Sequence, residues 1–150
     1  MSITNLKRAL ILSVLVLMPL KILPQVSPIF LLDDKVVTCL AKNIYHEARG
    51  EPVKGQLAVA LVTLNRVNNI NYPNSICDVV YAKHQFSWTN KRLKVSDSAA
   101  WAKAKDIAYK AISEYDALKQ FKATHFHHIG INPGWNLKRV TKIGNHVFYK

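Results

Sequence analysis

The stretch that decides the fold is residues 36–52, VVTCLAKNIYHEARGEP. Its apolar residues stand at positions 36, 37, 40, 41, 44, 45 and 48, which is the spacing of one face of an α-helix. Gly50 and Pro52 end this pattern, and Asp33 and Asp34 precede it as good helix-starting residues. The stretch therefore predicts a helix with one buried face.

Glu47 lies on that buried face. It follows Leu40 by seven residues, and seven steps of about 100° fall only about 20° short of two full turns. Burial raises the pKa of a carboxyl, and a carboxyl still protonated near neutral pH can act as a general acid. The alternative is that Glu47 pairs with Arg49 or Arg66, and periodicity alone does not choose between the two. Glu51 is a weaker candidate, because it lies beyond the glycine.

Three further helices are expected. Residues 54–67 are apolar nearly all round in their centre, which is typical of a helix in the middle of a domain. Ser75 is positioned to cap a short helix, and Ser96 to cap a long one that runs to about residue 115. Residues 83–95 between them have an irregular pattern.

The C-terminal part changes character. Residues 124–129 and 146–149 are rich in strand-forming residues, and Pro133-Gly134 and Gly144-Asn145 are turn signals. We therefore expect a mainly α (α+β) domain, a compact helical body closed by a small C-terminal β-hairpin.

Several residues suit a ligand-binding cleft. The stretch Gln85-Phe86-Ser87-Trp88 lies in the irregular segment, where exposed aromatic side chains commonly contact a ligand. Tyr72 and Trp135 are suited to stack on sugar rings. Each of these aromatic residues taken singly is better explained by the core or its rim than by contact with a ligand.

Histidines are dense in residues 124–128, THFHH. On a strand His125 and His127 share one face, as a zinc site requires. No H-E-x-x-H motif occurs, however, and the adjacent His46 and Glu47 do not have a metal-binding spacing. Histidines hydrogen-bonded around a cleft are the favoured interpretation.

The N-terminus is typical of export. Lys7 and Arg8 precede the apolar run at residues 9–20, and residues 26–32 are apolar again. We interpret residues 1–32 as a signal peptide or signal-anchor helix. The basic pair would stay inside the cell, and residues 33–150 would lie in the periplasm or on the outer face of the cytoplasmic membrane.

The interpretation of the net charge and of the two cysteines depends on that compartment. The chain has 150 residues and a formal net charge of +12, which predicts one domain and an anionic partner such as nucleic acid, lipid or bacterial wall. Export argues against nucleic acid. Cys39 and Cys77 would be two buried thiols in a cytosolic protein, and a disulfide becomes possible in an exported one.

At this point the motifs resemble those of the SleB-type cell wall hydrolases. The resemblance covers roughly residues 36–150 and is carried by long, ordered motifs at 45–52, 55–60, 65–67, 72–73, 77–81, 85–87, 124–127 and 143–149. It implies a lysozyme-like, mostly α fold and a lytic transglycosylase that acts on the β-1,4 bond between N-acetylmuramic acid and N-acetylglucosamine.

The resemblance also implies roles for individual residues. The first Glu of the Glu-Ala-Arg-Gly-Glu motif is the family's catalytic acid, and that position here is Glu47. It favours a Cys39–Cys77 disulfide. We expect the glycan to be held, or the acid tuned, by Tyr45, Arg49, Gln85, Phe86, Ser87, His127 and Asn145, in a monomer with no cofactor and no metal.

The sequence is also compatible with other functions. A muramidase that uses water is the near one, and a zinc-dependent N-acetylmuramoyl-L-alanine amidase is a second enzyme class. A membrane-tethered basic module that only binds the wall is the non-enzymatic alternative. A phage endolysin and a bacterial wall-remodelling enzyme fit the small size equally.

Overall fold

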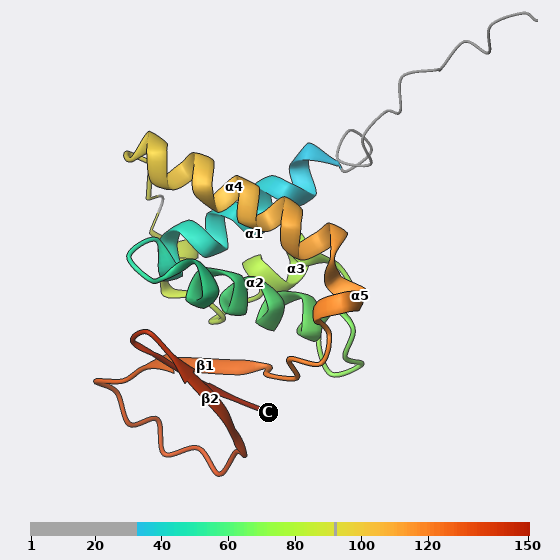
Figure 1. Cartoon of the computed structure of the whole chain (residues 1–150), viewed down its shortest axis with the longest axis vertical. Helices are drawn as coiled ribbons and strands as arrows, with labels where there is room; N and C mark the ends of the chain where they lie inside the picture. Colours follow the sequence, from blue (N-terminus) through green and yellow to red (C-terminus); the bar gives the residue numbers. More distant parts are fainter. Residues whose placement is uncertain (1–32, 92) are drawn as a thin grey trace, which may run out of the picture.

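The computed structural model describes residues 33–91 and 93–150 (Figure 1). The predicted signal or anchor at residues 1–32 lies outside the described residues. None of the helices in the described ranges is both long and apolar enough to span a membrane. The helices form one body and the strands lie together along one side of it, as Figure 1 shows.

Helix α1 (Asp34–Ala48) is the helix that the opening stretch predicted. Asp33 caps it, because the Asp33 carboxylate accepts a hydrogen bond from the Lys35 backbone N–H at 2.8 Å. Its apolar stripe is buried, with Leu40 and Ile44 fully inaccessible to solvent. The last turn of this helix therefore brings Glu47 to the edge of the core.

Helix α2 (Val53–Val67) is the central helix, as predicted, and it contacts α1, α3, α4 and β1. Its buried polar residues connect it to the C-terminal part of the chain. The Asn65 side-chain amide donates to the carbonyl oxygens of Phe121 and Ala123, at 2.5 and 2.8 Å. Asn65 thereby fixes the segment that leads into the first strand.

Three more α-helices complete the body. Ser75 caps α3 (Ile76–Tyr81) by accepting from the Asp78 backbone N–H at 3.2 Å, as predicted. The predicted Ser96 cap of α4 (Ser98–Ser113) is wrong: Asp97 caps the helix instead, and its carboxylate accepts from the Ala100 backbone N–H at 2.9 Å. A short helix α5 (Tyr115–Leu118) follows, and a 3₁₀ helix spans Ser87–Asn90.

A disulfide and a buried hydrogen bond connect α1 to its neighbours. Cys39 and Cys77 form a disulfide with a Cα–Cα distance of 5.3 Å, which joins α1 to α3. The buried Asn43 amide donates to the Thr63 hydroxyl on α2 at 3.0 Å. Both act on the N-terminal two thirds of α1 and fix this part of the helix against α2 and α3.

The sheet has three antiparallel strands in the order β1-β3-β2. They are β1 (His125–His128), β2 (Arg139–Ile143) and β3 (His146–Tyr149). The predicted hairpin thus gains a third strand. The sequence of β2, RVTKI, lacks the alternation of apolar and polar residues that marks a half-buried strand, and none of its residues is buried.

A small second core attaches the sheet to the helices. Phe148 on β3 is fully buried and packs with α2 residues Val59 and Val62 and with Ala48 at the end of α1. Ala48, a member of this cluster, follows Glu47 directly in the sequence. The same packing that attaches the sheet therefore fixes one side of the candidate site.

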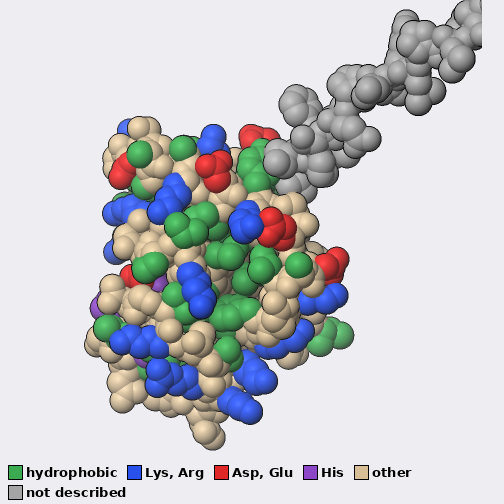
Figure 2. Space-filling view, viewed as in Figure 1, with side chains coloured by type: hydrophobic (Ala, Val, Ile, Leu, Met, Phe, Trp, Pro, Cys, Tyr) green, Lys and Arg blue, Asp and Glu red, His purple; other side chains and the backbone are tan. Residues whose placement is uncertain are grey.

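Charge is unevenly distributed along the chain. No acidic residue follows Asp116, whereas six basic ones do: Lys119, Lys122, Lys138, Arg139, Lys142 and Lys150. On the face shown in Figure 2, lysine and arginine side chains occur throughout, whereas aspartate and glutamate side chains are seen only above the lower part, which the sheet occupies in Figure 1. The segment that contains the sheet therefore carries basic residues that no acidic residue of the same segment offsets.

Candidate active site

A cleft of about 520 Å³ lies where the helical body meets the sheet. This volume is in the range of small-ligand sites, roughly 300–1,000 Å³. Its walls come from α1, α2, the 84–87 segment, all of β1, the β1–β2 loop and the start of β3. The lining residues are Glu47, Arg66, Tyr72, His84, Gln85, Phe86, Ser87, His125, Phe126, His127, His128, Ile131, Pro133, Trp135 and His146.

Glu47 supplies the cleft's carboxyl. Its side chain is half-buried, and burial raises its pKa above the ordinary value of 4.5. The charge of Arg66 acts in the opposite direction and limits this rise of the pKa. Of the described residues that line the cleft, Glu47 alone carries a carboxyl.

Arg66 is a buried cation on the floor of the cleft. Its Nε donates to the Thr124 carbonyl and its Nη1 to the Gln85 side-chain oxygen, each at 2.7 Å. The guanidinium also lies over the rings of Tyr72 and Phe86, 5.4 and 5.8 Å from their centroids. Arg66 therefore joins both walls of the cleft to α2.

The predicted alternative for Glu47, an ion pair, is not observed. Neither Arg49 nor Arg66 has a carboxylate oxygen within 4.0 Å in the described ranges. Arg66 acts on Glu47 through its charge over a longer distance. From sequence, Arg66 was considered only as an ion-pair partner and its place in the cleft was missed, although the polar pair Asn65-Arg66 follows directly on the apolar stretch of this helix and was a usable signal.

The 84–88 segment forms one wall. Gln85 and Ser87 are exposed and line the cleft, as expected of residues that contact a ligand. Phe86 and Trp88 are buried, which agrees with the core or rim position favoured for each aromatic residue taken singly, and Phe86 also lines the cleft. Trp88 stacks on His46 with ring centroids 4.6 Å apart, and this contact anchors the wall to α1.

The histidines of β1 are engaged with neighbouring side chains and backbone. His127 bonds the His128 carbonyl through Nδ1 at 2.8 Å and the Tyr149 hydroxyl through Nε2 at 3.0 Å. His125 bonds the Thr124 hydroxyl at 3.0 Å, and the Tyr72 hydroxyl lies 3.4 Å from its Nε2. In the described part of the chain, no three metal-ligating side chains converge.

His146 is a further cleft residue that the sequence did not single out for the site. Its side chain is almost wholly buried, and its Nδ1 has no hydrogen-bond partner among residues 33–91 and 93–150. Burial lowers its pKa, the Glu51 carboxylate raises it, and the nearby His128 and His127 lower it. The imidazole is therefore favoured in its neutral form at the cleft floor.

Three of the residues expected to hold the glycan lie outside the cleft lining. Tyr45 is buried, and its hydroxyl accepts hydrogen bonds from the Ser96 and Asp97 backbone N–H groups at 3.2 and 3.1 Å. Arg49 lies on the outer side, with its guanidinium 5.0 Å from the Tyr45 ring centroid. Asn145 is bound to a second glutamate, so all three have structural partners.

That second glutamate is Glu51, in the turn after α1. Its carboxylate accepts from the Asn145 backbone N–H at 2.8 Å and from the Asn145 side-chain amide at 3.2 Å. Gly144 next to it has φ +57°, and a Cβ there would collide with the Glu51 carboxylate. Glu51 therefore joins the α1–α2 turn to the β2–β3 turn and does not enter the cleft.

Comparison with known proteins assigns the class. Residues 50–149 match the family described as Cell Wall Hydrolase. The match spans most of the chain, so the chain belongs to the cell wall hydrolase family. The predicted relationship to the SleB-type members is confirmed by the relatives.

The relatives are spore enzymes from several bacilli. The chain is 31% identical over 121 residues to the spore cortex-lytic enzyme of Oceanobacillus iheyensis, covering 76% of this chain and 41% of the relative. It is 30% identical over 119 residues to that of Bacillus subtilis, covering 75% of this chain and 36% of the relative. The chain thus spans less than half the length of these curated relatives.

Solved structures agree with the fold. The catalytic domain of the germination-specific lytic transglycosylase SleB from Bacillus anthracis superposes with a TM-score of 0.66 at 28% identity, covering 79% of this chain and 97% of that domain. The catalytic domain of the Bacillus cereus SleB protein gives the same TM-score and identity and is covered over 91%. The mainly helical fold with a small sheet is therefore the fold of these catalytic domains.

Proposed function

We propose that this chain is a peptidoglycan-cleaving lytic transglycosylase in which Glu47 is the proton donor. The observation that carries the proposal is a single half-buried carboxyl, with a pKa raised by burial, in a cleft otherwise lined by basic, aromatic and small polar side chains. Residues 33–150 would be the catalytic domain, with the lysozyme-like architecture that the family resemblance implies.

The first step is protonation of the leaving group. Glu47 gives its proton to the oxygen of the β-1,4 bond between N-acetylmuramic acid and N-acetylglucosamine, and the C1–O bond of the muramic acid breaks. A carboxyl kept protonated by burial is suited to this step. The carboxylate that remains is stabilised by the charge of Arg66.

The second step returns the proton. The 6-hydroxyl of the same muramic acid attacks C1 and gives its proton to the Glu47 carboxylate, which forms a 1,6-anhydro ring and restores the acid. This route needs only one enzymic carboxyl, whereas most glycosidases that use water place two across the bond. The single carboxyl in the cleft lining favours the one-acid route.

The remaining cleft residues would hold the glycan. Gln85, Ser87 and His127 present polar groups along the walls, and Phe86 lies beneath them. Tyr45, Arg49 and Asn145, which were expected to contact the glycan, would act indirectly through the positions of α4, α1 and the β2–β3 turn.

The experiment is digestion of purified sacculi with the protein, followed by mass spectrometry of the released fragments. We expect fragments that end in 1,6-anhydro-N-acetylmuramic acid. Reducing ends would indicate a muramidase, and new free amino ends would indicate the amidase. Intact sacculi with bound protein would indicate the wall-binding module.

We further propose that residues 1–32 export the domain, so that it acts in the periplasm or on the outer face of the cytoplasmic membrane. The basic pair and apolar run at the N-terminus support this proposal. Expression of the full chain in a bacterium, with fractionation and protease protection, tests it. An endolysin role predicts lysis of the producing cell on induction, whereas wall remodelling does not.

A further inference from the structure

A connected set of rings runs along the sheet side of the cleft. We name the set of Tyr72, His125, Trp135, His127 and Tyr149 the aromatic ladder. Successive ring centroids in that order are 6.5, 5.4, 5.7 and 5.3 Å apart. Its members come from the α2–α3 loop, β1, the β1–β2 loop and β3, and all except Tyr149 line the cleft.

Trp135 is the exposed member of the aromatic ladder. The residue is 42% exposed, whereas the other two tryptophans are buried or half-buried. Its ring meets those of His125, His127 and Tyr149 at steep angles of 65°, 79° and 89°. Three edge-to-face contacts therefore fix the orientation of the indole and leave part of it uncovered.

The rings behind Trp135 are themselves fixed. The hydrogen bonds of His127 to Tyr149 and of His125 to Thr124 hold both imidazoles. A ligand that stacks on rings already fixed in place loses less conformational entropy than one that must order them. The arrangement is therefore that of a preformed binding surface.

We propose that the aromatic ladder is a carbohydrate subsite, in which one pyranose ring of the glycan stacks on Trp135 beside the bond that Glu47 cleaves. The inference rests on the proposed function and specifies how the substrate is held. One face of a pyranose ring presents C–H groups, which match the electron-rich face of an indole. Ile131 and Pro133 lie near it in the cleft lining and extend the apolar part of the surface.

A membrane is the competing occupant of an exposed tryptophan near basic residues. The position of Trp135 argues for the glycan, because the indole shares a concave site with Glu47. Interfacial anchors bury an apolar face in a flat lipid surface, which suits a convex patch. A glycan strand that occupies the cleft can reach both Glu47 and Trp135.

The test uses the full chain with Glu47→Gln, which would bind without cleaving. The probe is soluble peptidoglycan glycan strands freed of stem peptides, and the measurement is calorimetric titration. Trp135→Leu keeps apolar bulk and removes the ring, and we expect about tenfold weaker binding. Trp135→Phe keeps a ring and should retain most of the affinity. Ile70→Ala, at a fully exposed residue outside this cleft, is the matched control and should change nothing.

Two results would overturn the inference. One is equal glycan affinity in Trp135→Leu and Ile70→Ala. The other is unchanged glycan affinity with lost binding of Trp135→Leu to vesicles of anionic phospholipid, which would identify a lipid contact. Cleavage by the protein with Glu47 intact is measured separately. If it cleaves while Trp135→Leu binds normally, the subsite alone is wrong; if it never cleaves while Trp135 governs binding, the proposed function alone is wrong.

Discussion

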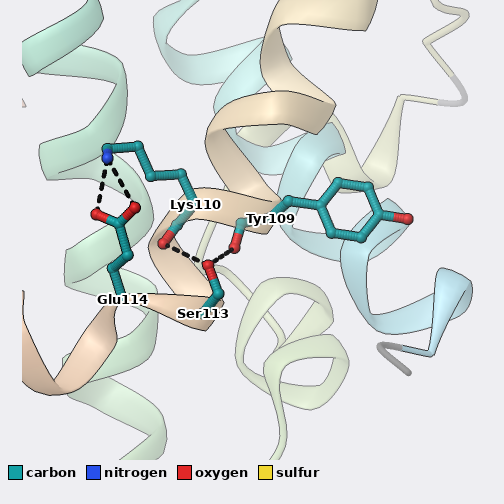
Figure 3. A network of polar contacts seen from close by, with 4 residues as sticks. All are labelled: Tyr109, Lys110, Ser113 and Glu114. Carbon is teal, nitrogen blue, oxygen red and sulfur yellow. Dashed lines mark hydrogen bonds and ion pairs between the residues drawn. The ribbon is translucent and has the colours of Figure 1, made fainter. Parts of the chain in front are cut away.

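The end of α1 and the turn that follows it each carry a glutamate, and the two have opposite surroundings. Glu47 faces a cleft in which burial raises its pKa. Glu51, four residues later, accepts two hydrogen bonds from Asn145. A third, Glu114 at the end of α4, forms an exposed ion pair with Lys110 at 2.7 Å (Figure 3). The same side chain is thus a candidate acid, a structural link and a surface charge, and its neighbours decide which.

The largest effect is expected at Glu47. Glu47→Gln removes the transferable proton and keeps the shape, so cleavage of sacculi should fall by roughly 10²- to 10⁴-fold, the contribution of a general acid. The measurement is the rate of release of soluble fragments. Glu114→Gln is the matched control and should leave that rate unchanged. Equal rates in the two variants would remove Glu47 from the mechanism.

Glu47→Gln should lower the rate of cleavage but should not lower the free energy of unfolding. A carboxyl whose pKa is raised in the folded protein holds its proton more tightly there than in the unfolded chain. Its stabilising contribution is complete below the unfolded pKa and is lost as pH rises through the folded pKa. Chemical denaturation at pH 7 should therefore show Glu47→Gln to be at least as stable as the parent. A marked loss of stability would mean that the carboxylate forms contacts that the structure lacks.

Removing the hydrogen bonds between Glu51 and Asn145 should mainly lower stability and should affect activity less. Glu51→Ala removes the acceptor of the exposed Asn145 N–H, which water can then bind, so it should lower the free energy of unfolding by about 0.5–1.5 kcal/mol. Gly144→Ala should cost ~1–3 kcal/mol, because a Cβ adds strain at φ +57° and collides with the same carboxylate. Thermal or urea unfolding measures both, and Gly50→Ala, where a Cβ meets nothing within 4 Å, is the control.

Arg66 should set the pH at which activity is lost. The reactive form has Glu47 protonated, so kcat/KM should fall as pH rises through the Glu47 pKa. The Arg66 charge lowers that pKa, and Arg66→Met should therefore move the falling limb of the pH profile to higher pH. Arg66→Lys keeps the charge and should leave the limb close to that of the parent. Lower rates with an unmoved limb in both variants would reduce Arg66 to a structural role.

The smallest effect is expected at the exposed pair. Both side chains of Lys110–Glu114 are about half exposed, and such pairs on a helix contribute roughly 0.3–0.5 kcal/mol. Ser113 in the same turn donates to the Tyr109 carbonyl at 2.9 Å, as Figure 3 shows, and would keep the helix end closed. Lys110→Ala should therefore lower the free energy of unfolding by no more than this amount. In high salt the variant and the parent should be equally stable. A larger loss would show that the helix end depends on the pair.

Sequence periodicity was sufficient to predict the helices of the body and the position of Glu47 on the buried side of its helix. The spacing in residues 36–48 placed α1 and its buried face, since every residue needed for the inference lies within one helix. The same spacing also placed Tyr45 in the buried stripe, which is where the structure has it. Its assignment to the glycan came from the family motif and overlooked this signal.

Contacts between distant residues could not be predicted in this way. Arg66 owes its place in the cleft to the Thr124 carbonyl, 58 residues away, and Glu51 owes its role to Asn145, 94 residues away. Strand β2 is solvent-exposed and carries no apolar alternation, so pairing with β3, and not its own composition, makes it a strand. The features that could not be predicted from the sequence therefore depend on how the sheet packs against the helices.

The most direct test of the contrast between the glutamates is a carbon-13 NMR titration of the Glu47 side-chain carboxyl in the purified protein, assigned by comparison with Glu47→Gln. We expect a Glu47 pKa above the ordinary 4.5, and a further rise in Arg66→Met. A Glu47 pKa at or below 4.5 would contradict this expectation, because the carboxyl would then be ionised and unable to donate a proton to the glycan near neutral pH.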